Sequence, residues 1–250
     1  MSDYGFPTET IELPSQGKLY PENSPLRSGK VDVKYMTAKE EDILTSTNLI
    51  QKGTVLDKLM ESVLVTKGVK PTDLVIGDLN AVMVASRILG YGKDYEIAVQ
   101  CSACEKKFEH VVDLTTLTMN PPEEVSDNGE FKMTLPTGVE ITFKMLTRGD
   151  EKAIQAEIDG MKKLNGQVDS EVSTRLKHII TSVNGNRDRK LVRDFAENMI
   201  IRDVRALREH LKKVAPDVNF DLKINCSHCN EINEVRMPLG ANFFWPELRA

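Results

Sequence analysis

The chain has 250 residues, a net charge of −5 and a pI near 5.5. This acidic balance argues against nucleic acid as its main partner, because holding a phosphate backbone usually needs a basic excess. The sequence has no run of 18 apolar residues and begins without the basic and apolar segments of a signal peptide. We therefore expect no membrane insertion and a reducing cytoplasm, where cysteine pairs bind metal or do redox chemistry more often than they form disulfides.

Residues 1–30 are predicted to form an extended N-terminal arm, because prolines and glycines recur through this segment and disfavour helices. Residues 31–94 are predicted to form a mainly helical N-terminal region, which opens with a strand at 31–35. Thr37 and Glu40 have the spacing of a capping box, in which each side chain satisfies a free backbone donor. A helix is therefore expected to begin just after Thr37.

Two more helices are predicted before the first cysteine, at about 54–65 and 79–89. Asp78 has the residue type and the position of an N-cap for the second of these helices. Gly90 is expected to end that helix. A strand at 95–101 follows, because aliphatic and polar residues alternate there.

Residues 128–216 are predicted to form an inserted α/β region. Strands at 131–135 and 139–145 flank a Pro-Thr-Gly turn and indicate a hairpin. Three apolar stripes at helical spacing follow, and we expect them to be helices that pack on one core. These stripes are Ile154, Ile158, Met161 and Leu164; Leu176, Ile179, Ile180 and Val183; and Ile200, Val204, Leu207, Leu211 and Val214.

A short internal duplication holds the residues with the most specific chemistry. Residues 95–104 align without gaps with residues 220–229, and both copies end in Cys-Ser-X-Cys. Each copy predicts a strand that leads into a tight turn and returns as a partner strand. The two copies use every cysteine of the chain, namely Cys101, Cys104, Cys226 and Cys229.

Four thiolates from two such turns form a closed tetrahedral site of the kind that holds structural Zn²⁺. We therefore predict an α+β fold with a split zinc ribbon, formed by residues 95–118 and 219–240 lying side by side with their turns facing. A helical N-terminal part precedes this ribbon, and the hairpin-plus-helices segment is inserted into it. Closing so long a loop costs about 4 kcal/mol of chain entropy, whereas zinc binding contributes on the order of 10 kcal/mol.

Three other interpretations of the cysteines stay open: a redox-active pair, two disulfides, or iron in place of zinc. A thioredoxin-like pair begins a helix beside a βαβ unit, whereas both pairs here follow predicted strands. Structural disulfides are rare in a reducing compartment. Iron fits the same four thiolates, and the sequence does not separate it from zinc.

Motifs of the common enzyme classes are missing, including phosphate-binding glycine loops, His-Glu-X-X-His and Gly-X-Ser-X-Gly. We therefore expect a protein that is not an enzyme. His178 and His210 are expected to lie on solvated helix surfaces, and His228 lies inside the second cysteine turn. It is expected to be exposed there, with a hydrogen bond to a ligand as the alternative.

Besides the N-terminal arm, whose apolar residues are expected to dock on another surface, two segments are candidates for contacts with partners. One helix has a basic outer side, formed by Arg202, Arg205, Arg208, Lys212 and Lys213. The other segment is the aromatic C-terminal tail, residues 241–250, which contains Phe243, Phe244 and Trp245 in a row. The tail is expected either to fold back onto the ribbon or to anchor a partner, since exposed aromatics are typical interface hot spots.

The order of several segments along the chain is typical of one protein family. These segments are residues 13–20, 31–41 and 77–92, the two split cysteine pairs, and residues 201–205. In this order the chain resembles the T4-type baseplate hub and hub-assembly proteins of contractile-tailed bacteriophages. The resemblance implies a structural or chaperone-like part in building the baseplate hub, with other tail and hub proteins as partners. It implies the host cytoplasm during assembly, with the virion baseplate as a further location, and it offers only the four cysteines as metal ligands.

We accordingly expect a zinc-stapled structural or assembly protein of the baseplate hub. The alternative is a zinc-ribbon nucleic-acid-binding protein, which the basic helix favours and the acidic pI opposes. A thiol oxidoreductase is the third hypothesis, and it requires a reactive thiol of low pKa. The oligomeric state is not readable from the sequence.

Overall fold

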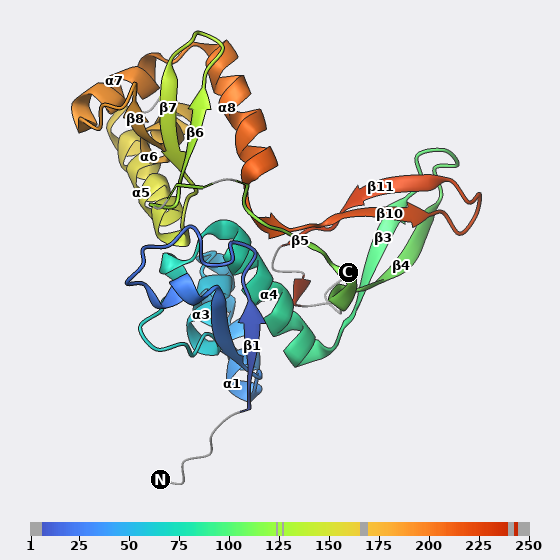
Figure 1. The fold of residues 1–250 in the computed structure, drawn as a ribbon. Helices are drawn as coiled ribbons and strands as arrows, with labels where there is room; N and C mark the ends of the chain where they lie inside the picture. Colours follow the sequence, from blue (N-terminus) through green and yellow to red (C-terminus); the bar gives the residue numbers. More distant parts are fainter. Residues whose placement is uncertain (1–6, 124, 127, 166–169, 240–242, 245–250) are drawn as a thin grey trace, which may run out of the picture.

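The computed structural model describes residues 7–123, 125–126, 128–165, 170–239 and 243–244. Within these residues, helices and small antiparallel sheets follow one another along the chain, which confirms the α+β class (Figure 1). None of the helices in this part of the chain has the length and apolar content that a membrane span requires.

Residues 7–34 pack against the rest of the molecule. β1 (Thr8–Glu12) pairs antiparallel with β2 (Lys30–Lys34), and a short 3-10 turn at Pro25–Ser28 lies in the connection between them. Leu13 and Leu26 in this segment are buried in the main core. The apolar residues between the prolines of the predicted arm therefore dock on the rest of the protein and pack into its main core.

Three short helices follow: α1 (Ala38–Thr45), α2 (Thr47–Gln51) and α3 (Val55–Val63). The predicted capping box at the start of α1 is confirmed, because the Glu40 carboxylate accepts hydrogen bonds from the Thr37 amide and hydroxyl. The same carboxylate, which is fully buried, also binds Lys34 Nζ at 2.8 Å and Ser62 Oγ at 2.5 Å. Glu40 thus joins β2, α1 and α3.

The long helix α4 (Ile76–Tyr91) begins earlier than predicted, and the expected N-cap is wrong. Val75 caps the helix, and Asp78 lies in its first turn. There Asp78 accepts hydrogen bonds from the amide and hydroxyl of Ser15 and from the hydroxyl of Tyr20, at 2.6–2.8 Å. Burial raises the pKa of this carboxyl. The residue therefore holds the N-terminal segment against α4 and does not cap the helix.

The end of α4 also differs from the prediction. Gly90 lies inside the helix, where an added Cβ would come 2.7 Å from the Met36 sulfur. Gly92, with φ of +85°, is the residue at which the chain leaves the helix. Gly90 therefore serves close packing, whereas Gly92 supplies the backbone conformation that L-residues rarely adopt.

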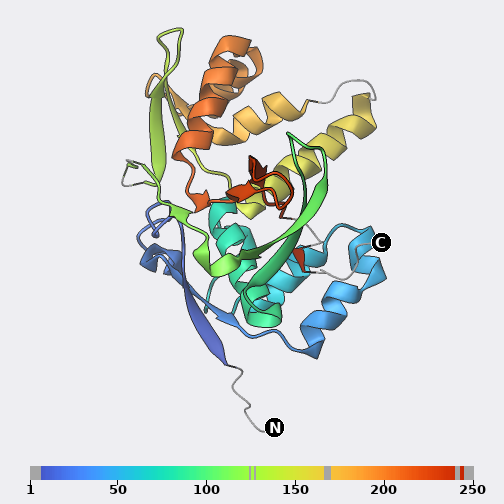
Figure 2. The same ribbon diagram turned by 90° about the vertical axis from the view of Figure 1, so that its right-hand side faces the viewer.

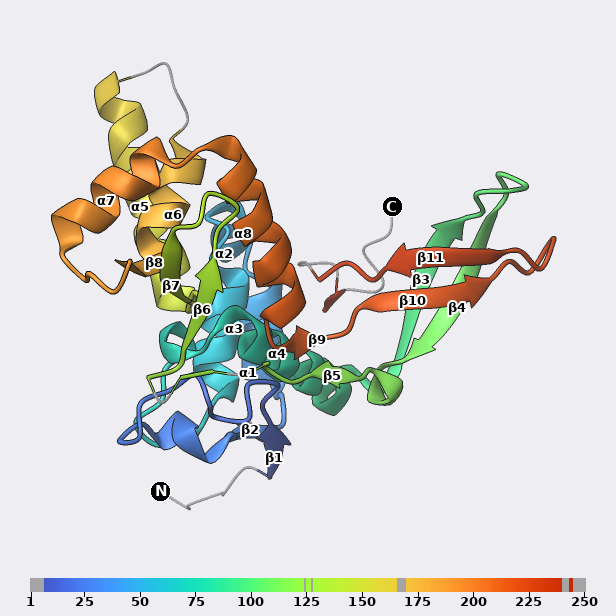
Figure 3. The same cartoon turned by 45° about the horizontal axis from the view of Figure 1, so that its top comes forward.

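Both halves of the duplication form hairpins. β3 (Asp94–Gln100) pairs with β4 (Lys107–Asp113), and β10 (Asp221–Asn225) pairs with β11 (Ile232–Arg236). The two hairpins are separate sheets that run out together from the body of the molecule (Figures 1 and 3). We call them, with their turns, the cysteine arm.

The inserted region contains a sheet in the order β6 (Glu130–Thr134), β7 (Glu140–Lys144) and β8 (Ile180–Val183), with antiparallel neighbours. The predicted hairpin is thus confirmed as β6 and β7. The helices of this region are α5 (Arg148–Asn165), α6 (Glu171–Ile179), α7 (Arg189–Asn198) and α8 (Ile201–Val214), as Figure 2 shows from the side.

Two of the apolar stripes are used differently from the prediction. The second stripe is not one helix, because α6 ends at Ile179 and the next residues form β8. Two β-branched residues, Ile180 and Val183, bound this strand, where such residues are favoured. The third stripe begins one turn late, because Ile200 is the N-cap of α8 and is 49% exposed. In the first stripe, Ile154 and Ile158 are buried, whereas the side chain of Leu164 lies outside the described residues.

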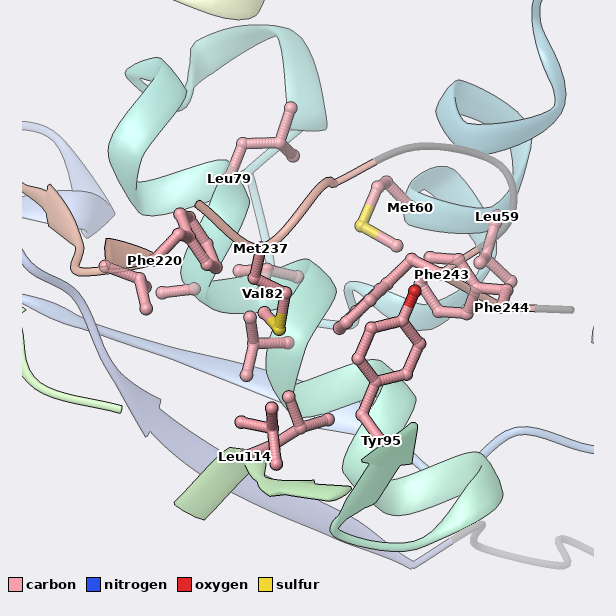
Figure 4. Packing of buried hydrophobic residues seen from close by; sticks show 14 of the residues in the cluster. Leu59, Met60, Leu79, Val82, Tyr95, Leu114, Phe220, Met237, Phe243 and Phe244 are labelled. Carbon is pink, nitrogen blue, oxygen red and sulfur yellow. The ribbon is translucent and has the colours of Figure 1, made fainter. Parts of the chain in front are cut away.

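The apolar residues form two separate cores. The first core joins residues from near both chain ends, including Leu13 and Phe244. Figure 4 shows Phe244 packed in this core with Leu59 and Tyr95. The buried residues of the second core all lie within residues 131–214, and Leu19 and Val125 pack against them from outside this range. Phe131 and Phe143 stack at its centre, with ring centroids 5.4 Å apart.

The chain passes from the first core to the second and back at one place. β5 (Met119–Asn120) on the outward path pairs with β9 (Asp217–Val218) on the return path. We call the part of the chain around the first core the first lobe and residues 128–216 the inserted lobe. Asp57 of the first lobe binds Arg148 and Lys152 of the inserted lobe at 2.8–3.1 Å. The two ends of the inserted lobe therefore lie together. An insertion of this kind does not interrupt the fold of the domain that holds it.

Candidate metal centre

Each cysteine turn is built by the same backbone geometry. Glu105 and Asn230 follow the two cysteine pairs at equivalent positions, and both have positive φ, at 58° and 62°. In the first turn the amide of Ala103 donates to the Cys101 sulfur at 3.4 Å, and the amide of His228 does the same to Cys226 in the second. The duplication seen in the sequence is thus a duplication of conformation.

The four sulfur atoms meet between the two turns. The Sγ atoms of Cys101 and Cys229 are 3.6 Å apart, those of Cys104 and Cys226 are 3.8 Å apart, and all four lie within 4.8 Å of one another. A tetrahedron with Zn–S bonds of about 2.3 Å has sulfurs about 3.8 Å apart. The predicted meeting of the two distant turns is confirmed, and the sulfurs are spaced so that they could hold one metal ion.

The same distances bear on the disulfide interpretation. A disulfide needs sulfurs about 2.05 Å apart, and all four cysteines are free thiols in this structure. Both pairs also lie in strand–turn–strand hairpins and not at the start of a helix, where a thioredoxin-like redox pair would be. The geometry therefore favours metal binding over the two rival chemistries.

The electrostatics of the site favour a cation. The amides of Cys104 and Ala103 point at the Cys101 sulfur and lower the pKa of that thiol to about 6. The amide of Glu231 assists the Cys229 thiolate, but lost hydration and the three neighbouring sulfurs outweigh it and raise the pKa of Cys229 to about 12. Four thiolates around one point repel each other, so a divalent ion at the centre would relieve that repulsion.

One residue beside the sulfurs was missed by sequence reasoning. Asn233 of β11 is buried, and its Oδ1 accepts hydrogen bonds from the amide and hydroxyl of Ser102, at 2.9 and 3.2 Å. Its Nδ2 lies 3.7 Å from the Cys101 sulfur. Phe108 occupies the equivalent position in the first hairpin. This break in the duplication was the signal available in the sequence: an apolar position in one copy is an amide in the other.

The remaining sequence candidates lie away from the sulfurs or play other parts. Phe243 and Phe244 are buried in the first core, where the Phe243 ring is 5.0 Å from that of Tyr95 (Figure 4). They fold back toward the base of the cysteine arm, whereas Trp245 lies outside the described residues. His228 is exposed, as expected.

The two helical histidines are less solvated than predicted. His178 Nε2 lies 3.1 Å from a carboxylate oxygen of Glu157. The ring of His210 contacts the edge of Phe143, with centroids 5.6 Å apart. The basic side of α8 is exposed as predicted, with Arg202 and Arg205 in solvent.

A comparison with known protein families gives one match of nearly full length. The sequence model described as T4 bacteriophage base plate protein matches residues 7–245. Comparison with curated proteins and with solved structures gives no match. A match over this span includes both lobes and both cysteine turns, and the chain therefore belongs to the T4 bacteriophage base plate protein family.

Proposed function

We propose that the chain is a structural or assembly protein of the baseplate hub, and that Zn²⁺ bound by the four cysteines staples its fold. The family supports a structural role in the tail baseplate, with other baseplate proteins as partners. The observation that carries the metal proposal is the meeting of four sulfurs from hairpins more than 120 residues apart.

Zinc would act here as a cross-link and not as a catalyst. Four protein thiolates fill the tetrahedral coordination of Zn²⁺ and leave no open position for water or substrate. Cys101, Cys104, Cys226 and Cys229 would each supply one thiolate, and Asn233 would hold the first turn beside the second. We propose on this basis that the protein acts through protein–protein contacts without catalysis, during assembly in the host cytoplasm.

The metal proposal is tested on the purified full chain. Elemental analysis should find one zinc per chain, and a thiol reagent should modify the four cysteines only after a strong chelator is added. The variant Cys104→Ser should lose the metal, whereas Ser102→Ala should keep it. A chain purified without metal whose four thiols react freely would overturn the proposal, and iron in place of zinc would overturn the identity of the ion.

The assembly proposal needs its own experiment. The chain is produced together with the neighbouring baseplate proteins, and native mass spectrometry reads the partners, their stoichiometry and the bound metal together. We expect a complex with hub components. A chain that stays alone while those components assemble normally without it would contradict the hub role.

A further inference from the structure

Charge is unevenly distributed along this acidic chain. Residues 128–216 contain 17 lysines and arginines against 13 aspartates and glutamates, a net charge of +4 within a chain of −5. The rest of the protein therefore carries −9. An excess of one sign on one lobe is a feature that electrostatic steering of a partner uses.

Part of this excess gathers around a hollow in the inserted lobe. A cavity of about 520 Å³ opens where α6, β8 and α7 meet, close to the end of β7. Its lining includes the buried apolar residues Ile180 and Val192. Among the described residues, five lysine or arginine side chains and one carboxylate, that of Glu157, also line it. The hollow thus combines an apolar floor with a cationic rim.

Three of the five cations are already engaged by carboxylates of the same lobe. Lys144 Nζ contacts both oxygens of Asp150 at 2.9 Å, and Lys177 Nζ lies 2.5 Å from Glu197. Arg187 binds the Glu130 carboxylate through two nitrogens, at 3.0 and 2.6 Å. These pairs fix the walls of the hollow and leave little of their charge for a ligand.

The other two cations are Arg189 and Arg193 of α7. Both are exposed, and within the described residues neither has a direct hydrogen bond or salt bridge. Arg193 lies near Glu197, but that carboxylate is bound by Lys177, which lowers its pKa more than Arg193 does. Residues four apart on a helix lie on one face, with Cβ atoms about 6 Å apart. Two guanidinium groups at this spacing can each bind one carboxylate through a two-pronged contact.

We propose that this pocket binds an acidic peptide segment of another baseplate protein, with Arg189 and Arg193 each receiving one carboxylate. Alternate residues of an extended segment lie about 6.5 Å apart on one face, which matches the spacing of the two arginines. The proposal rests on the proposed function for the identity of the partner. The elements that line the pocket, α6, β8 and α7, lie at the opposite end of the molecule from the cysteine arm (Figures 1 and 3).

Nucleic acid is the rival occupant, and the pocket is poorly suited to it. Single strands are usually held by aromatic rings on which bases stack, and no Phe, Tyr or Trp is among the described residues that line this hollow. A chain with net charge −5 also repels a long polyanion. A short acidic peptide carries little charge beyond the two contacts, so that repulsion is small.

The test uses the full zinc-loaded chain and a short fluorescein-labelled peptide of alternating glutamate and threonine. Fluorescence anisotropy is measured for the wild type, for Arg189→Glu with Arg193→Glu, and for Arg202→Glu with Arg205→Glu. The last variant is the matched control, because it makes the same charge change on exposed residues of the same lobe outside the pocket. Thermal melting and zinc content verify that each variant is folded.

We expect the pocket variant to bind the peptide at least about tenfold more weakly than the wild type. The α8 variant should stay within about twofold, because distant charges are screened at physiological salt. Equal loss in both variants, or no binding by the wild type, would overturn the proposal. Tighter binding of an oligothymidylate of the same charge than of the peptide would overturn it in favour of nucleic acid.

This measurement and the assembly experiment can fail separately. The peptide assay needs no other phage protein. If the hub complex forms but the pocket does not bind the peptide, only this inference is contradicted. If the pocket binds the peptide but the chain forms no complex with hub proteins, only the proposed hub role is contradicted.

Discussion

The two lobes of this protein close their cores in different ways. The inserted lobe builds its core from one continuous segment, residues 131–214, whose strands and helices are neighbours in sequence. The first lobe must bring Leu13 and Phe244 together around that insertion. Loop closure over so long a path costs chain entropy that a local fold avoids. The cysteine arm lies in the lobe that has this difficulty, which is where a cross-link contributes most.

The largest expected effect comes from removing the proposed staple. Cys226→Ser should abolish metal binding, which contributes on the order of 10 kcal/mol in structural zinc sites. Hydrogen exchange read by mass spectrometry should show protection lost in β3, β4, β10 and β11 and kept in β6 and β7. Ser227→Ala, the adjacent exposed residue, is the control. Unchanged protection of the cysteine arm would show that the two lobes do not differ in this way.

The aromatic tail should be the next most sensitive element of the first lobe. Phe243 is buried among residues from distant segments, so Phe243→Ala should cost about 3–5 kcal/mol. Phe143→Ala should cost a similar amount in the second core, where that ring is fully buried. Denaturant unfolding, followed by hydrogen exchange in each lobe, would distinguish the effects of the two substitutions. Loss of protection spread evenly over both lobes in either variant would mean that the cores are not separate units.

The joint between the lobes offers a third test. An added Cβ at Gly77 would lie 1.8 Å from the carbonyl oxygen of Pro216, so Gly77→Ala should force α4 away from the segment that joins α8 to β9. We expect a cost of about 1–3 kcal/mol, as for other overpacked sites. Gly160→Ala in α5 is the control, because its added Cβ would meet no described atom within 4 Å apart from its chain neighbours and the backbone of its own helix. It should leave the melting temperature unchanged or raise it.

Asn233 should matter to the metal more than to the fold. Asn233→Ala leaves the Ser102 amide without its partner, and residues that orient metal ligands typically contribute about 10–100-fold in affinity. Competition with a chromogenic chelator would measure the change. Asn225→Ala, an exposed residue of the same hairpin, should have no effect. An equal affinity for both variants would assign Asn233 to packing alone.

The smallest effect concerns acid. The buried Glu40 is costly to desolvate, but its hydrogen bonds with Lys34, Ser62 and Thr37 outweigh burial and lower its pKa from 4.5 to about 2. A lowered pKa means that the folded state gains stability above pH 4.5 and loses it as pH falls toward 2. Melting temperatures should fall over this window, and Glu40→Gln should flatten the fall. If the melting temperature of the variant falls with pH as steeply as that of the wild type, carboxylates other than Glu40 cause the loss of stability in acid.

Local sequence patterns predicted the structure correctly where the conformation of a segment depends on its own residues. The capping box at Thr37, the hairpin of β6 and β7 and the two cysteine turns were all predictable, because neighbouring residues satisfy each other there. These patterns gave wrong predictions where the conformation depends on contacts with residues far away in the sequence. Asp78 looks like an N-cap, but its hydrogen bonds go to Ser15 and Tyr20. Ile180 and Val183 continue a helical stripe, but β7 offers them a strand to pair with.

The same division holds for the candidate site. The sequence alone determined which four side chains are thiols, how each pair turns, and that two copies exist 125 residues apart. Only the tertiary structure decided that Cys101 faces Cys229, that Asn233 lies behind them and that Arg189 and Arg193 share a hollow. The physical reason is range: backbone conformation follows from adjacent residues, whereas the meeting of distant side chains depends on how two cores pack around one insertion.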